Sequence, residues 1–457
     1  MMEANLALAT AHRKLSANTP QGDADALALS DDILQLDPAN PHAMFLAGTA
    51  LYRMKQNGLA TIVFNAASQL NPGEASIWNN LGCALREWHP HDAVSVFSKA
   101  LECDPEHTEA SKNLAACLGR IGRRDEAIAL NKQLMEARPD DPDVPYNLAL
   151  DLLHTDDWRA AFAAYEGSEG NAQRTVRNYH ADKQTPRWNG TDGQTVVVYG
   201  EQGVGDEIFA ASAYAELLEA YPDTRFIFEC DKRLEALFKR SFPSVEIRGT
   251  RGLGELDWPR VDQPDQAIIA FGAFALVKPA PATVKPWLKP NPAMVKMFKD
   301  YLRELGSGPN IGLSWSGGAI EWDRAERTIP LDVLGPIVST PGANIISLEY
   351  IDGELPEGVH DIAWATRKGV DLDLTAALIA ALDAVVSVPQ TVCDIAGAVG
   401  TPIYALVHEN PPWRFAEASG GAWVWEDCQV FRKKAGASWM PTVTKAARKL
   451  REDLGLT

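Results

Sequence analysis

A glycine-rich turn with an acidic pair follows a short apolar segment near the middle of the chain. Residues 196–199, Val-Val-Val-Tyr, are β-branched and aromatic and predict a buried strand. Residues 200–207 then read Gly-Glu-Gln-Gly-Val-Gly-Asp-Glu, and a helix is expected over residues 208–220. A strand, a glycine turn and a helix together build ligand sites at the carboxyl ends of strands in α/β sheets. Asp206 would favour the helix N-terminus, and its carboxylate could also face a substrate.

The turn matches neither of the two common phosphate-binding motifs. It is not the G-x-G-x-x-G dinucleotide fingerprint, and no acidic residue about 20 positions later clearly serves a ribose. It also lacks the Gly-Lys-Ser/Thr of a P-loop. By itself the turn is equally consistent with a tight connection between a strand and a helix.

The first part of the chain carries an internal repeat. Dipeptides that end in proline recur at spacings of 34, 33 and 34 residues, namely Asp37-Pro38, Asn71-Pro72, Asp104-Pro105 and Arg138-Pro139. Small residues between them let paired helices approach closely, and each proline ends a helix. The pattern resembles the tetratricopeptide repeat and predicts a solenoid whose concave face binds extended segments of other proteins. A purely supporting or dimerising solenoid is the alternative, so a homo-oligomer is left open.

From residue 195 onward, expected strands alternate with helices, which is typical of parallel α/β sheets. Two such sets are joined by the proline-rich residues 278–292, and a cleft between two doubly wound halves would face the carboxyl ends of their strands. A final helix near residues 443–454 could return to the first half. The expected strands are residues 196–199, 225–230, 245–248, 266–270, 344–348, 361–363, 384–388 and 402–407, and another opens residues 310–318.

The predicted fold class is therefore a helical solenoid followed by two Rossmann-like domains. The expected limits are residues 1–166 for the repeats, 167–194 for a linker, 195–290 for the first half, 291–440 for the second half and 441–457 for the C-terminal helix.

The bulk composition excludes several classes of function. A formal net charge of −18 and a pI near 5.0 disfavour a nucleic-acid partner, which calls for a basic surface. No apolar stretch approaches the ~20 residues that span a bilayer. The six cysteines form no CxxC pair, so we expect reduced thiols in a cytoplasmic protein and no zinc site. Asp371-Leu-Asp373 resembles a metal-binding D-x-D, but its place before a helix favours a cap.

The order of motifs across the whole chain resembles bacterial glycosyltransferases that carry tetratricopeptide repeats. Gly-Glu-Gln-Gly-x-Gly-Asp comes first, followed by residues 233–243, Ile311-Gly-Leu-Ser-Trp-x-Gly-Gly318, Arg327-Thr-Ile-Pro-Leu331, residues 377–383, Ala396-Gly-Ala-Val-Gly-x-Pro402 and Pro412-Trp-Arg414. The later half is similar to the GT-B heptosyltransferases of lipopolysaccharide synthesis. The fused architecture looks like bacterial protein glycosyltransferases, including those that modify flagellin. The resemblance implies a GT-B fold that needs no metal or other cofactor, with the acceptor on the first half and a nucleotide-sugar donor on the second.

On the acceptor side, the resemblance implies that Asp206 is the general base. A carboxylate near an acceptor hydroxyl can take its proton as the sugar transfers, typically with inversion. Gly203 and Gly205 would clear space beside it, next to Glu207. An N-cap carboxylate is the alternative for Asp206.

On the donor side, the loop after the first strand of the second half could bind a phosphate through backbone N–H groups. Arg327 matches the basic residue that faces the donor phosphates in the related family. A surface ion pair with Glu321, Asp323 or Glu326 is its alternative. The donor-side candidates are Ser314, Trp315, Ser316, Gly317, Gly318, Arg327, Glu349 (for the nucleoside), Gln390, Thr391, Asp394, Trp413 and Arg414.

One loop departs from the family pattern. The family usually has an Asp-Asn/Thr pair and then a His before Leu-Ala-Gly-Ala-Leu-Gly, where this chain has Pro389, Gln390 and Asp394. Gln390 and Thr391 can still hydrogen-bond a ligand, but an acid in place of the histidine changes the charge beside the donor. Trp413 and Arg414 are expected to close over the donor, with a core tryptophan as the alternative.

These observations predict a GT-B glycosyltransferase that moves a sugar from a nucleotide donor to a Ser or Thr hydroxyl of a protein, with flagellin favoured. The repeats would hold the acceptor. A non-catalytic adaptor with a degenerate transferase half is one alternative, favoured by Pro389 and Asp394. A transferase that acts on a lipid or saccharide acceptor is another.

Overall fold

The computed structural model describes residues 2–168, 179–180, 185–251, 264–278, 283–317, 324, 327–350, 353–367, 369–416 and 424–456. The chain divides into two units, Met1–Asp151 and Leu152–Thr457. The expected limit of the repeats at residue 166 therefore falls inside the second unit. There α10 (Trp158–Gly167) packs against α14 (Ala270–Val277) of the later α/β region, because the Phe162 ring lies 5.9 Å from the rings of both Phe271 and Phe274.

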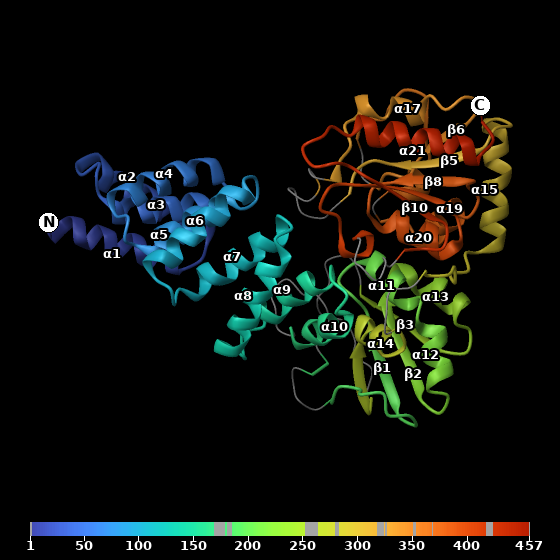
Figure 1. Ribbon diagram of the computed structural model, residues 1–457, viewed down its shortest axis with the longest axis horizontal. Helices are drawn as coiled ribbons and strands as arrows, with labels where there is room; N and C mark the ends of the chain where they lie inside the picture. The colour runs from blue at the N-terminus through green and yellow to red at the C-terminus, as the bar shows by residue number, and fades with distance from the viewer. Residues whose placement is uncertain are drawn as a thin grey trace. The chain divides into compact units, whose positions relative to one another are not determined.

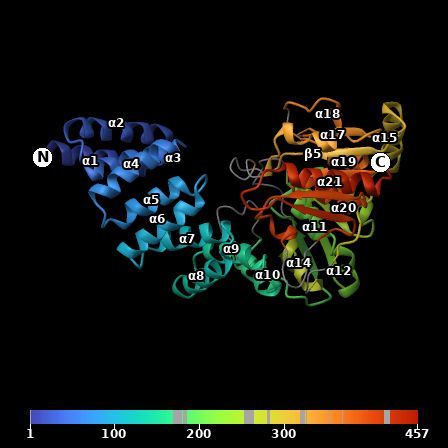
Figure 2. The same cartoon turned by 45° about the horizontal axis from the view of Figure 1, so that its top comes forward.

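The first unit is a stack of helices in which each helix from α1 to α8 packs against the next (Figures 1 and 2). Proline opens α2, α3 and α6, where a missing backbone N–H leaves no helical bond unmade. The side chains of Thr19 and Asn40 cap α2 and α3. The helices are α1 (Met2–Ser16), α2 (Pro20–Leu36), α3 (Pro41–Arg53), α4 (Asn57–Leu70), α5 (Ala75–Leu85), α6 (Pro90–Cys103), α7 (Thr108–Arg120), α8 (Arg124–Ala137) and α9 (Asp143–Leu152).

Two glycines explain how neighbouring helices of the repeats come close. A Cβ at Gly48 would lie 2.7 Å from the Phe64 ring, and one at Gly82 would lie 2.5 Å from the Phe97 ring. Both phenylalanines are fully buried. The small residue on the first helix of each pair therefore makes room for an aromatic side chain from the second, as the sequence pattern predicts.

Replacing Gly82 with Ala should lower the free energy of unfolding of the repeats. We compare it with Gly58→Ala, because no atom lies within 4 Å of the Cβ position at Gly58 in α4. Both changes gain helix propensity, so Gly82→Ala should be less stable than Gly58→Ala by ~1–3 kcal/mol, the usual cost of overpacking a core. Urea unfolding followed by circular dichroism measures the difference. Equal stability of the two variants would contradict this packing.

The first sheet of the second unit is parallel, with the strand order β3-β2-β1-β4. The four strands expected from the sequence are confirmed, although β3 extends to Arg251. Their bounds are β1 (Thr195–Tyr199), β2 (Arg225–Asp231), β3 (Glu246–Arg251) and β4 (Gln266–Ile269). The helices of this half are α11 (Val204–Ala211), α12 (Tyr214–Ala220), α13 (Glu235–Ser241), preceded by a 3-10 turn at Lys232–Leu234, and α14 (Ala270–Val277).

The single helix expected over residues 208–220 is wrong in its extent. The segment forms two helices, α11 and α12, with a break at Ser212 and Ala213. The Ser212 hydroxyl donates to the Phe209 carbonyl over 2.6 Å, which is how serine competes with helical bonding. Because α11 begins at Val204, Asp206 lies in its first turn.

The second sheet is also parallel and has the order β10-β9-β8-β5-β6-β7. The outer strand β10 was not predicted from the sequence; the others were. The strands are β5 (Asn310–Ser314), β6 (Asn344–Ser347), β7 (Val359–Asp361), β8 (Ala384–Ser387), β9 (Ile403–Val407) and β10 (Cys428–Arg432). The helices are α15 (Pro292–Leu305), α17 (Gly335–Val338), α18 (Ala363–Thr366), α19 (Leu372–Ile379), α20 (Thr391–Val399) and α21 (Met440–Asp453), with 3-10 turns at Leu331–Val333 and Trp413–Phe415.

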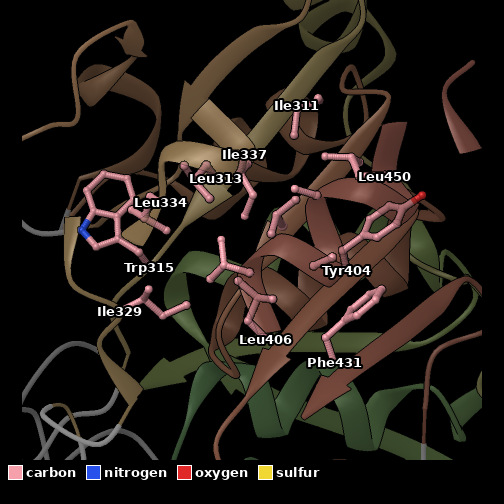
Figure 3. Packing of buried hydrophobic residues seen from close by; sticks show 14 of the residues in the cluster. Ile311, Leu313, Trp315, Ile329, Leu334, Ile337, Tyr404, Leu406, Phe431 and Leu450 are labelled. Carbon is pink, nitrogen blue, oxygen red and sulfur yellow. The ribbon is translucent and has the colours of Figure 1, made fainter. Parts of the chain in front are cut away.

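The C-terminal helix belongs to the second half, so the expectation that residues 441–457 return to the first half is wrong. In α21, Val443, Ala446, Ala447 and Leu450 are buried in one apolar cluster with Ile311 and other residues of the second sheet. Figure 3 shows Leu450 in this cluster, near Ile311 and Tyr404. The apolar face of α21 covers this sheet because the sheet needs a helical layer on each face to bury its strands.

Within the part of the chain that the structure describes, no helix is both long enough and apolar enough to cross a membrane.

Candidate functional site

The first strand of each sheet lies where the strand order reverses. β1 pairs with β2 on one side and β4 on the other, and β5 pairs with β6 and β8. In open parallel sheets, ligands bind outside the carboxyl ends of the strands at such points. The residues singled out from the sequence follow β1, β5, β6, β8 and β9, so most of them lie at these two points.

Arg414 connects the two halves of the second unit at the first turns of two helices. Its Nη1 donates to Asp206 Oδ1 on α11. Its Nη2 donates to Asp394 Oδ2 on α20 over 3.0 Å. The Asp206 side chain is 37% exposed, whereas that of Asp394 is 3% exposed. Asp206 is therefore paired but still open to a ligand, and Asp394 is a buried partner of the arginine.

Glycine at position 205 allows the two helices to meet. A Cβ there would lie 2.5 Å from Asp394 Oδ2 and 3.4 Å from the Thr391 Cα. A Cβ at Gly203 would lie 2.7 Å from the Asp206 carboxylate. The two glycines thus clear space for side chains of the protein itself, at the place where the sequence predicted space for an acceptor.

The pKa values of Asp394 and Arg414 are both shifted by burial and by the charges around them. The pKa of Asp394 is raised to about 7, mainly by burial; Arg414 lowers this pKa, and the Asp206 carboxylate adds to the increase. Although burial lowers the pKa of the Arg414 guanidinium, Asp394 and Asp206 hold it above its usual value. Arg414 therefore stays charged, and the charge on Asp394 depends on pH near neutrality.

The raised pKa of Asp394 predicts a pH-dependent contribution to stability. The folded protein binds this proton more tightly than the unfolded chain, so the contribution to the free energy of unfolding falls as pH rises from about 4 to about 7. Asp394→Asn removes the titrating carboxyl and with it this pH-dependent contribution to the free energy of unfolding. The stability of the variant minus that of the wild type should therefore increase over this window and stay constant above it. Thermal unfolding of both proteins at a series of pH values measures the difference; a difference that does not change with pH would contradict the prediction.

Glu207, expected on the acceptor side, instead supports the loop that follows β2. Its side chain is 2% exposed, and Oε2 accepts a hydrogen bond from the Asp231 amide over 2.8 Å. The neighbouring Glu201 is also buried and accepts from the Phe271 amide and the Tyr165 hydroxyl, each over 2.8 Å. These two acids stabilise the conformation of the turn and are not exposed to a ligand.

Glu349 occupies the backbone loop in which a phosphate was expected. Its Oε1 accepts from the amides of Trp315 and Ser316 over 2.7 and 3.0 Å and from the Ser314 hydroxyl over 2.7 Å. Its Oε2 accepts from the Ser316 hydroxyl. The Glu349 side chain is 3% exposed. Two amides of the expected phosphate cradle therefore already donate to a carboxylate of the protein, which would also repel an anion placed there.

The loops after β5 and β8 are in direct contact. Gln390 Nε2 donates to the Ser314 hydroxyl, and Arg327 Nη1 donates to the Pro389 carbonyl over 3.3 Å. A Cβ at Gly317 would lie 3.1 Å from the same carbonyl oxygen. Gly318 and the three acids proposed as partners of Arg327 (Glu321, Asp323 and Glu326) lie outside the described residues.

A pocket of about 320 Å³ opens beside Glu349. Its wall is mostly apolar, from Trp315, Ile329, Pro330, Leu331 and Leu355, with Glu349 and Arg324 among its polar members. An apolar pocket with a few polar groups is the usual environment of a small-molecule ligand.

Trp413 is a packing residue, as the alternative from the sequence proposed. Its ring lies 5.7 Å from the rings of Phe209 and Phe271 and 5.8 Å from that of Trp158. Trp413 thereby joins the segment after β9 to α10, α11 and α14, and it is not packed over the loop after β5.

The D-x-D segment behaves as a helix cap. The Asp371 side chain accepts from the Asp373 amide over 3.0 Å at the start of α19, and the Asp373 carboxylate binds Arg240. Among the residues that the structure describes, no group of three His, Cys, Asp or Glu side chains is arranged to hold a metal ion. All six cysteines are free thiols.

The structure brings Asp206, Asp394 and Arg414 together, and it groups Ser314, Trp315, Ser316, Glu349 and Gln390 separately. The sequence reasoning assigned Arg414 and Asp394 to the donor and missed that both join Asp206. Positions so far apart in the chain carry no local signal of contact. An acid in place of the family histidine was a usable hint, because a buried acid requires a cationic partner.

The family model for the tetratricopeptide repeat matches residues 84–148. Together with the stacked helices, this match shows that the chain carries tetratricopeptide repeats. Protein FlbA of Caulobacter vibrioides is 29% identical over 472 residues, which cover 89% of this chain and 77% of that protein. The match to this relative therefore includes both the repeats and the α/β sheets of this chain.

Solved structures match only part of the chain. YrrB, described as a TPR protein with an unusual peptide-binding site, is 24% identical over 35% of this chain and 80% of its own, with a TM-score of 0.31. MamA is 16% identical over 37% of this chain and 91% of its own, with a TM-score of 0.33.

Proposed function

We propose that the protein is an inverting glycosyltransferase with a GT-B fold that moves a sugar from a nucleotide-sugar donor to a Ser or Thr hydroxyl of a protein. The observation that carries the proposal is the position of Asp206. Its carboxylate is 37% exposed, lies in the first turn of α11 beyond the carboxyl end of β1, and is held by a cation from the other half. A carboxylate that is positioned and open to a ligand can accept the proton of an acceptor hydroxyl.

In the proposed reaction, Asp206 takes the hydroxyl proton while the acceptor oxygen attacks the anomeric carbon. The bond from that carbon to the nucleotide phosphate breaks on the opposite face, which inverts the configuration. The N-terminus of α20 and Arg327 would stabilise the leaving phosphate, in place of a metal ion. The pocket beside Glu349 would hold the nucleobase, and Glu349 would accept from the base or ribose.

The tetratricopeptide repeats would hold the protein acceptor. Such repeats commonly bind protein partners, and flagellin is the acceptor that we favour, on the resemblance of the chain to transferases of that type. The six free thiols suit a reducing compartment, so we place the reaction in the cytoplasm.

A panel of nucleotides and a transfer assay test the proposal. A nucleotide that binds the folded state should raise the melting temperature, and the base and phosphate count that do so identify the donor class. Intact-protein mass spectrometry of flagellin incubated with the matching nucleotide sugar should then show added sugar masses. If no nucleotide raises the melting temperature and no mass is added, the protein is not a glycosyltransferase of this kind.

A second function is favoured by the contacts of Glu349. Because that carboxylate occupies the amides of the loop after β5, the donor site could be degenerate and the protein a tetratricopeptide-repeat adaptor. An adaptor would bind its partner equally well as wild type and as Asp206→Ala, with no transfer by either protein. Transfer by wild type alone would exclude this function.

A further inference from the structure

We infer that Arg414 is a positioning residue for Asp206, and that Asp394 is the anchor through which the second half of the unit sets the base on the first half. This inference rests on the proposed function of Asp206 as the base. It gives Arg414 and Asp394 a different role from donor binding, namely control of the acceptor side.

The guanidinium of Arg414 bridges two carboxylates from different halves. One terminal nitrogen of Arg414 bonds Asp206 and the other bonds Asp394, so a single planar group links the two carboxylates. The guanidinium carbon lies 5.1 Å from the centre of the Phe209 ring, one turn after Asp206 on α11. A planar guanidinium with two fixed donors and an aromatic face beneath it has one preferred orientation, which a lysine ammonium cannot reproduce.

Asp394, the anchor, is held rigidly by its surroundings. Asp394 is buried at the junction of α11 and α20, where the absence of a side chain at Gly205 leaves room for its Oδ2. Its Oδ1 accepts from the Trp425 indole over 3.5 Å. The backbone beside Arg414 is also held, because Arg432 donates to the Phe415 carbonyl over 2.7 Å. Arg414 is therefore fixed to the second half on both sides, and Asp206 is the most exposed member of the group.

A second ion pair also joins the two halves, at a different place. Arg240 on α13 binds both oxygens of Asp373 on α19 over 2.9 and 2.6 Å, and it also donates to the Lys289 carbonyl of the segment that joins the halves. That pair ties the halves together at the connecting segment, away from Asp206. Of these two bridges, the one through Arg414 is the one that touches the base.

Two consequences follow for the proposed reaction. Arg414 holds the Asp206 carboxylate in one orientation, so the base is positioned only while the halves are joined at α11 and α20. Loss of this bridge should slow proton transfer and so lower kcat. Nucleotide binding should not weaken, so the KM for the nucleotide sugar should stay unchanged.

The test compares Arg414→Lys and Asp394→Asn with Arg240→Lys in the full-length chain, using the transfer assay. Arg240→Lys is the matched control, because it makes the same change in a two-oxygen arginine pair between the halves without touching Asp206. We expect kcat to fall about 10²-fold in both test variants, the usual effect of a misplaced catalytic group, with an unchanged KM for the nucleotide sugar and an unchanged kcat in the control. Guanidinium added to Arg414→Ala should restore part of the lost kcat, which a purely structural defect would not allow.

The outcomes separate this inference from the proposed function. Wild type without any transfer overturns both. Wild-type transfer with an unchanged kcat in Arg414→Lys and Asp394→Asn overturns the inference alone. A rise in the KM of the nucleotide sugar with kcat intact would also overturn it, because Arg414 would then be a donor ligand.

Discussion

Asp206→Asn should lower kcat for sugar transfer by roughly 10²–10⁴-fold, the usual contribution of a general base. The amide is close in size to the carboxylate but cannot take the hydroxyl proton. Because Asp206 lies on the first half and the proposed donor pocket on the second, nucleotide binding should be unchanged. Steady-state kinetics measures the loss, and the shift in melting temperature with the nucleotide checks binding.

Glu219→Gln is the matched control for this substitution. Glu219 is an exposed acid on α12 of the same half, and the change removes the same charge. The control should transfer sugar at the wild-type rate. If Asp206→Asn keeps wild-type kcat, the carboxylate is a helix-terminal residue and not a base; if it loses nucleotide binding as well, the halves have separated, because Arg414 has lost one of its two partners.

Removal of residues 1–151 should abolish transfer to a protein acceptor and leave nucleotide binding intact. The cut follows the boundary between the two units, and the second unit keeps both sheets and the α10 aromatic contacts. In the proposed function the repeats supply the surface that binds the protein acceptor, so without them the acceptor would no longer be held for transfer. The effect should be a loss of at least 10²-fold in kcat/KM for the protein, since the whole binding contribution of the repeats is removed.

The nucleotide-dependent shift in melting temperature serves as the folding control for the shortened chain. A shift equal to that of the full chain shows that the second unit is folded. If the shortened chain still modifies the protein acceptor, the repeats do not recruit it. If it modifies a lipid or saccharide acceptor at the full rate while the protein acceptor is inert in both chains, the alternative acceptor class is correct.

The repeats and the order of strands could be read from the sequence because their signals are local and recur. Proline-terminated pairs at regular spacing and small residues opposite Phe64 and Phe97 arise from contacts within one helix pair. Strands such as β1, β8 and β9 were recognised because each is a short apolar run between turn residues. Asp206 could be singled out for the same reason, because the glycine-rich turn that carries it is a continuous stretch of the sequence.

Only the tertiary structure decided which side chains meet. The partner of Asp206 is 208 positions away in the chain, and Glu349 reaches the loop after β5 from the neighbouring strand β6. Such contacts depend on how sheets and helices pack, which no run of residues encodes locally. The same reason explains the errors on α21 and β10. An apolar helix face can cover either sheet, and a short outer strand such as Cys428–Arg432 is recognised only beside its neighbour β9. The sequence by itself thus determined the repeats, most of the strands and the choice of Asp206 as a candidate, and the packing of the two halves determined which side chain holds the Asp206 carboxylate.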